Sequence, residues 1–266
     1  MGVIKDLNFF EHIEELRWHI LRSVIFLMLI TILIFVFSSF VFEDIIFGPL
    51  STDFWSYNVL CKIMDDFCVE EIPVKLINTE VAGQFFLHIK TAFMLGIMAS
   101  VPYFLWEIWR FILPALHKSE KNYARTLLGF GFILFLIGSA FGYFIIFPIT
   151  LLFLTGYSVS SEIVNMPNIS NYFAYLSDTV LWTGLMFELP ILAYFLSKMG
   201  ILSTEFMHTY RKHLYVAILV VAAAITPSPD IFSQIMVAIP LFILYEVSVL
   251  IVARVQKHNE INDLNN

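Results

Sequence analysis

Charged residues are scarce in this chain. Asp, Glu, Lys and Arg make up 14% of its 266 residues, whereas hydrophobic residues make up 59%. A soluble globular domain normally carries about 25% charged residues. The composition therefore excludes an ordinary soluble domain and indicates a protein whose helices lie in a membrane.

Sequence motifs for the common kinds of catalysis are missing as well. The chain contains no GxxxxGK[ST], HExxH, GxSxG or CxxCH pattern, and its histidines form no pairs within the apolar segments. ATP hydrolysis by this chain alone, metalloprotease or serine hydrolase activity and c-type haem binding are therefore not expected. A basic stripe with interleaved aromatic residues is also absent, which argues against nucleic acid as a partner. We predict a protein that is not an enzyme and that holds no metal or cofactor.

Only two cysteines are present, Cys61 and Cys68, and six residues separate them. This spacing, without a histidine pair, does not match the usual structural zinc sites. In an oxidising compartment the two cysteines could form a disulfide across a short loop, and two unpaired thiols are the alternative.

Long apolar segments, by contrast, recur along the whole chain. A helix needs about 20 residues to cross a hydrocarbon core of about 30 Å. We predict an all-α integral membrane protein, a single membrane domain over residues 1–266, with six transmembrane helices near residues 21–42, 85–106, 126–147, 171–195, 213–225 and 232–252. The fifth segment is short for a complete crossing.

Lysine and arginine are distributed unequally around these segments. Of the 15 such residues, Lys62 and Lys75 lie in the first long loop, residues 43–84, and Lys90 lies within the second segment. The other 12 fall on the opposite side of the six segments. Because positively charged loops stay in the cytoplasm, both termini are expected to be cytoplasmic and loop 43–84 external.

Carboxylates stand on the predicted cytoplasmic side, directly before the first apolar segment. Glu11, Glu14 and Glu15 lie among apolar residues at helical spacing, which predicts an amphipathic helix along the membrane surface. At a separation of four residues, Glu15 could simply be a solvated partner of His19, and Arg17 could pair with Glu14.

A second cytoplasmic acid, Glu120, follows the second segment and is surrounded by basic residues. A guanidinium group binds a carboxylate through two parallel hydrogen bonds, so two separated carboxylates can hold two adjacent arginines. Glu15 and Glu120 together therefore suggest a cytoplasmic binding site that prefers arginine to lysine.

One acid, Glu188, lies inside the fourth apolar segment. Ionisable residues in the membrane usually face a cavity or a partner helix, and they mark functional sites. The alternative is a protonated glutamate hydrogen-bonded between helices, for which Gln234 and Ser233 are candidates. A proton-coupled transporter of a small cation also remains open, although the two halves of the chain do not resemble inverted repeats.

Four motifs, in this order along the chain, resemble the TatC family, the receptor subunit of the twin-arginine protein translocase. They are residues 10–17 (FEHIEELR), residues 109–116 (WRFILPAL) with Glu120, residues 187–190 (FELP), and residues 226–230 (TPSPD) with Ser233, Gln234, Pro240 and residues 244–246 (LYE). The resemblance covers nearly the whole chain. Two features depart from the family pattern: His19 stands where the family often has a second arginine, and loop 43–84 is long, acidic and cysteine-bearing.

The resemblance implies a concave arrangement of six helices in the bacterial inner membrane. It implies binding of signal peptides with paired arginines on folded cargo, and export driven by the proton-motive force. Glu15 and Glu120 would hold the arginines, and Arg17 would support them. Glu188 would line the concave face, with Gln234 as a further contact. The implied partners are TatA-type and TatB-type single-span subunits in an oligomeric complex, together with membrane lipid.

Overall fold

The computed structural model describes residues 9–63, 75–112, 121–157, 160, 166–226 and 231–264. Within these ranges the regular elements are helices, and the only β contact is an isolated bridge between Ile77 and Asn168. The predicted all-α class is therefore confirmed for the part of the chain that is described.

Among the described residues, five helical stretches are long and apolar enough to cross a membrane. They are Ile13–Val36, Gly83–Phe111, Gly129–Gly156, Ile169–Lys198 and Ile231–Lys257. The remaining predicted span corresponds to α10 (Arg211–Ile225), which has 15 residues. At about 1.5 Å per residue, α10 is shorter than a hydrocarbon core of about 30 Å. Its shortness agrees with the sequence analysis, and a sixth crossing stays a prediction.

The chain divides into two compact units. The first contains Met1–Val41 and Phe85–Phe132, and the second contains Phe42–Gln84 and Ile133–Asn266. The organisation into a single domain stays a prediction, and the two units are described separately below.

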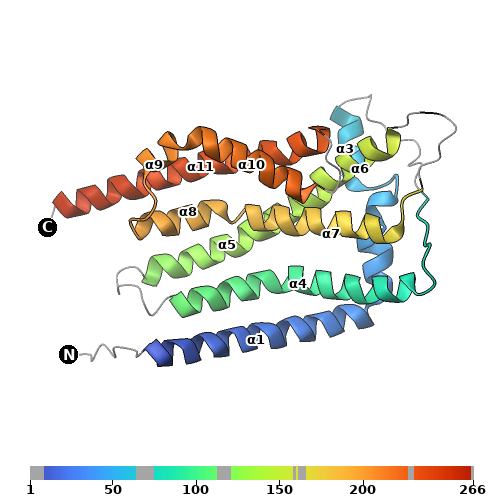
Figure 1. Cartoon of the computed structure of the whole chain (residues 1–266), viewed down its shortest axis with the longest axis horizontal. Helices are drawn as coiled ribbons and strands as arrows, with labels where there is room; N and C mark the ends of the chain where they lie inside the picture. Colours follow the sequence, from blue (N-terminus) through green and yellow to red (C-terminus); the bar gives the residue numbers. More distant parts are fainter. Residues whose placement is uncertain are drawn as a thin grey trace. The chain divides into compact units, whose positions relative to one another are not determined.

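The first unit contains α1 (Phe9–Val36) and most of α4 (Gly83–Ile112), which lie side by side (Figure 1). The structure joins the predicted surface helix and the first span into one continuous helix, α1, so the prediction of a separate surface helix is wrong. No glycine or proline interrupts residues 9–36, and nothing in the local sequence therefore ends the helix between its amphipathic and apolar parts. At one point α1 and α4 approach closely, because a Cβ atom on Gly96 would lie 2.3 Å from Thr31 Oγ1.

A long interrupted helix enters the second unit. It consists of α5 (Lys121–Phe141), the π-helical turn η5 (Gly142–Ile146) and α6 (Phe147–Gly156). The helix continues past residue 147, where the predicted span ended, although Pro148 cannot donate a hydrogen bond to the carbonyl of Phe144. The hydroxyl of Ser56 donates to that carbonyl instead. A partner from a distant segment thus allows the helix to pass the proline.

Five further helices belong to the second unit: α7 (Ile169–Met186), α8 (Leu189–Lys198), α9 (Thr204–Thr209), α10 and α11 (Ile231–Leu264). Small residues let α7 approach α5 and η5. A Cβ atom on Gly142 would lie 3.1 Å from the Thr179 carbonyl oxygen, and one on Gly184 would lie 2.4 Å from Ser139 Oγ. Packing of this kind is common between membrane helices, because dispersion contacts rather than the hydrophobic effect hold them together.

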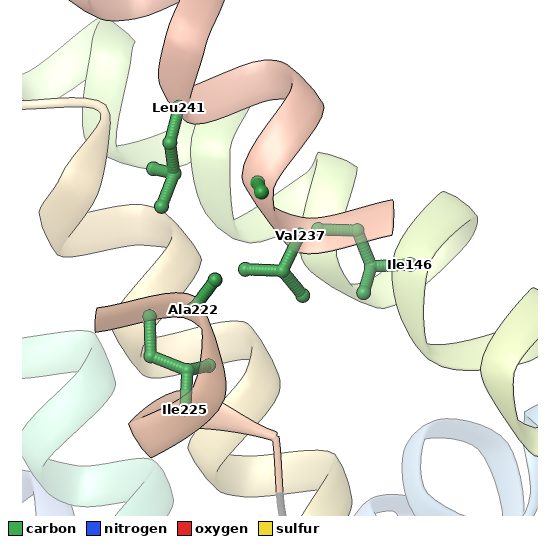
Figure 2. Packing of buried hydrophobic residues seen from close by; sticks show 6 residues of the cluster. Ile146, Ala222, Ile225, Val237 and Leu241 are labelled. Atoms are coloured by element: carbon green, nitrogen blue, oxygen red, sulfur yellow. The ribbon is translucent and has the colours of Figure 1, made fainter. Parts of the chain in front are cut away.

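Buried aliphatic side chains hold α10 in place. Figure 2 shows Ile146 of η5 beside Ala222 and Ile225 of α10 and beside Val237 and Leu241 of α11. A second cluster joins α8, α9 and α11 through Ala193, Met207, Tyr245, Val249 and Val252. Leu214, Tyr215 and Ile218 of α10 pack against this second cluster. Both halves of the short helix α10 are therefore held by packing.

The segment after α1 contains α2 (Ser38–Phe40), η1 (Val41–Ile46), η2 (Gly48–Leu50) and α3 (Trp55–Ile63). Three tyrosine hydroxyls donate to its carbonyls: Tyr143 to Ile45 at 2.6 Å, Tyr172 to Ile46 at 2.7 Å and Tyr57 to Pro49 at 2.8 Å. These bonds satisfy backbone groups that the irregular turns leave without helical partners.

Candidate functional site

Glu15 and Arg17 lie in the N-terminal half of α1, and both side chains are exposed. Within the described residues, Glu15 takes part in no ion pair or hydrogen bond. The alternative in which Glu15 pairs with His19 is not formed, because the imidazole of His19 turns to Glu107 of α4 instead. Glu15 therefore presents a carboxylate that a ligand can reach.

His19, Tyr103 and Glu107 form a polar cluster between α1 and α4. His19 Nδ1 is paired with Glu107 Oε2, and the hydroxyl of Tyr103 donates to Glu107 Oε1 at 2.8 Å. Both oxygens of the Glu107 carboxylate thus have a partner, which matters because this residue is only 4% exposed. A buried carboxylate is tolerated when its oxygens are paired in this way.

Glu107 was not among the residues predicted from the sequence. The second span was predicted to end at residue 106, whereas α4 continues to Ile112, so Glu107 was assigned to a loop. The usable signal was a tyrosine four residues before the acid, which places Tyr103 and Glu107 on one helical face. The partner on α1 could not be read from the sequence, since it depends on how the two helices are aligned.

Glu120, the second predicted carboxylate of the arginine site, lies outside the described residues. Before the residues that are not described, α4 ends at Ile112, and Trp109 and Arg110 belong to its last turn. The joint action of Glu15 and Glu120 stays a prediction.

Glu188 stands at a break between α7 and α8. Pro190, in the first turn of α8, lacks the amide hydrogen that would bond to the Met186 carbonyl, so the α-helix is interrupted there. Short-range bonds replace the missing one: the Glu188 amide donates to the Leu185 carbonyl and the Ile191 amide to the Glu188 carbonyl. The side-chain Oε1 of Glu188 is buried and has no hydrogen-bond partner among the described residues.

Gln234 links two helices of the second unit. Its amide nitrogen donates to the Leu219 carbonyl of α10 at 3.0 Å. In the described part of the chain, Gln234 and Glu188 are not hydrogen-bonded to each other. A role for Gln234 beside Glu188 stays a prediction.

A second polar cluster, formed by Arg211, Tyr215 and Glu246, joins α10 to α11. Glu246 Oε1 accepts hydrogen bonds from Arg211 Nη2 and from the Tyr215 hydroxyl, each at 2.5 Å. The bonds to Glu246 and then to Tyr215 raise the pKa of Arg211 above its usual value. Glu246 therefore acts as a hydrogen-bond acceptor between the two helices.

An apolar cavity of about 370 Å³ lies among α8, α9, α10 and α11. Aliphatic side chains dominate its lining, among them Met186 and Leu189, which stand on either side of the α7–α8 break that contains Glu188. Glu188, whose buried Oε1 has no hydrogen-bond partner among the described residues, thus stands between two residues that line an apolar cavity.

Cys61 is disulfide-bonded in the structure. Cys68, the only other cysteine of the chain, lies outside the described residues. The pairing of Cys61 with Cys68 stays a prediction.

These features define a multi-pass helical membrane protein with an exposed carboxylate at one end of α1 and an intramembrane acid at a helix break. Residues 11–240 match the family model described as "Sec-independent protein translocase protein (TatC)". A TatC from Blattabacterium sp. subsp. Periplaneta americana (strain BPLAN) is 37% identical over 95% of this chain and 97% of its own length. A TatC from Aquifex aeolicus (strain VF5) is 32% identical over 90% and 92%, respectively.

A solved structure, described as the twin arginine translocase receptor TatC, superposes with a TM-score of 0.74 at 31% identity. The superposition covers 92% of this chain and 100% of the solved chain. The chain belongs to the TatC family. It is accordingly a membrane subunit of the Sec-independent, twin-arginine protein translocase, and this favours translocation over the cation-transporter alternative.

Proposed function

We propose that this chain recognises signal peptides with paired arginines at the cytoplasmic face of the bacterial inner membrane. The observation that carries the proposal is the exposed carboxylate of Glu15, which has no partner among the described residues, in a chain of the TatC family. An exposed acid that pairs with no protein cation is free to pair with a cation of a ligand.

In this proposal the two arginines bind Glu15 and Glu120, one carboxylate for each guanidinium group. Bidentate hydrogen bonds from guanidinium to carboxylate supply both charge and direction, which a lysine ammonium cannot reproduce. Arg17, two residues after Glu15 on α1, supports the site by balancing the acidic charge around it.

The topology that the proposal requires has six spans and cytoplasmic termini. Support comes from the distribution of lysine and arginine and from α10, which packs against α11 and η5 although it is short. A short helix can cross where the bilayer is locally thinned. Reporter fusions after residues 160 and 205 would test it, since the topology places the first outside and the second in the cytoplasm.

The apolar part of the signal peptide, or a helix of a partner subunit, would insert beside Glu188. The cavity next to the α7–α8 break supports this placement, because its aliphatic lining fits an apolar helix face better than a polar ligand. Gln234 would contribute a further contact on the same unit. TatA-type and TatB-type single-span subunits would complete an oligomeric complex that moves folded cargo with the proton-motive force.

The deciding experiment is photo-crosslinking from a probe at position 119, which leaves Glu120 intact, to a signal peptide with paired arginines or paired lysines. We expect crosslinking to favour the arginine peptide and to fall about tenfold in E15Q and in E120Q, since a charge-assisted hydrogen bond is lost. E14Q is the matched control and should behave like the unmodified chain. Equal crosslinking of both peptides would overturn the proposal.

A further inference from the structure

The contacts between α1 and α4 follow one antiparallel alignment. From one end to the other, Phe35 stacks on His88, Thr31 lies against Gly96, Phe26 stacks on Tyr103, and His19 is paired with Glu107. Residue numbers rise along α1 while they fall along α4. The contacts span 17 residues of α1, from His19 to Phe35.

The middle contacts are apolar or steric, whereas a histidine stands at each end. At one end His88 Nε2 lies 3.1 Å from the carbonyl oxygen of Phe35, and at the other His19 is paired with Glu107. Apolar side chains tolerate a shift along a helix pair, because many arrangements bury similar area. A buried carboxylate does not, since a shift would leave one of its oxygens without a partner.

The pair between His19 and Glu107 is also held by burial and by neighbouring side chains of α4. The relative exposures of its side chains are 14% and 6%, and Tyr103 donates to the second carboxylate oxygen. The ring of Phe111 meets the His19 ring edge to face at 6.0 Å. The imidazole is thus held by a charge partner and by an aromatic ring, both on α4.

Glu15 lies one helical turn before His19. Residues four apart occupy the same face of a helix, so the position of His19 on α4 decides where Glu15 stands relative to the last turn of α4. We propose that His19 and Glu107 are positioning residues of the signal-peptide site, whose ion pair fixes the alignment of α1 on α4 and hence the place of the Glu15 carboxylate. The inference rests on the proposed function.

The test compares binding of a paired-arginine signal peptide to the full chain in lipid nanodiscs, by fluorescence anisotropy, together with the melting temperature. We expect H19A to weaken binding about tenfold and to lower the melting temperature, because Glu107 becomes a buried, unpaired charge. H19R should restore both, since a guanidinium group can pair with the same carboxylate. R22Q, which removes an exposed neighbouring cation of α1, should bind like the unmodified chain.

The double variant H19A/E107Q separates positioning from simple stability. It leaves no unpaired charge, so the melting temperature should recover, while the affinity should stay about tenfold low because the charged link is still missing. Spin labels at exposed positions 20 and 106 should report a broadened distance distribution in this variant and a wild-type distribution in H19R. If H19A/E107Q regains affinity together with stability, or H19A binds normally, the inference is overturned. If the unmodified chain binds arginine and lysine peptides equally, the proposed function itself fails.

Discussion

The side chain of Phe187, at the α7–α8 break, covers Gly138 of α5 so closely that a Cβ atom on Gly138 would lie 2.7 Å from Phe187 Cβ. Real Cβ atoms do not approach this closely, so a larger residue at position 138 would force Phe187 or the backbone of α5 to shift. Gly138 therefore matters for packing and for the geometry of the break.

G138A should lower the stability by about 1–3 kcal/mol, the usual effect of overpacking a tight contact. The measurement is thermal unfolding of the purified protein in detergent. G129A is the matched control, because no described atom lies within 4 Å of a Cβ added there. Equal melting of G138A and G129A would contradict the packing argument.

Tyr172 supports a second prediction, on the segment that follows α1. Its hydroxyl is the donor to the Ile46 carbonyl, and the residue is only 3% exposed. Y172F should lower the stability by about 1–3 kcal/mol, because a buried carbonyl loses its donor. Y210F, at an exposed tyrosine of the same unit, should leave the melting temperature unchanged. A Y172F protein as stable as Y210F would show that water replaces the hydroxyl.

The sequence allowed the all-α class, the places of the long helices and the short α10 to be predicted, because these follow from local hydropathy and length. Residue pairs between helices could not be predicted in the same way. The sequence pattern offered only Glu15, four residues away, as a partner for His19, and this alternative was wrong, because the structure pairs His19 with the buried Glu107. Likewise, the continuation past Pro148 depends on Ser56, a partner that no local pattern indicates.

The disulfide at Cys61 gives a third prediction. If Cys61 pairs with Cys68, a thiol-reactive maleimide should label neither cysteine until the protein is reduced, and both afterwards. Closing so short a loop stabilises by about 2 kcal/mol in the chain-entropy model, so reduction should lower the melting temperature modestly. In C61S, Cys68 should become reactive without reductant. Identical labelling before and after reduction would refute the pairing.

Substitutions of Glu188 should affect stability and export in opposite directions. Its Oε1 is buried without a hydrogen-bond partner among the described residues. Burying such an atom costs free energy, so the carboxyl does not stabilise the fold. E188Q keeps the shape of the side chain, and E188L also removes the polar atoms. Both variants should melt at or above the temperature of the unmodified protein, because a group that is unfavourable to bury has been removed.

Export should respond in the opposite way. If the carboxyl serves the insertion of a signal peptide or partner helix, E188Q and E188L should reduce export of a folded reporter with a twin-arginine signal, by about tenfold or more, at normal protein levels. The matched control is S197A in α8, since Ser197 is also buried and its hydroxyl is likewise without a partner among the described residues. S197A should export normally. A strong loss of stability in E188Q with normal export per folded molecule would instead make Glu188 a structural residue.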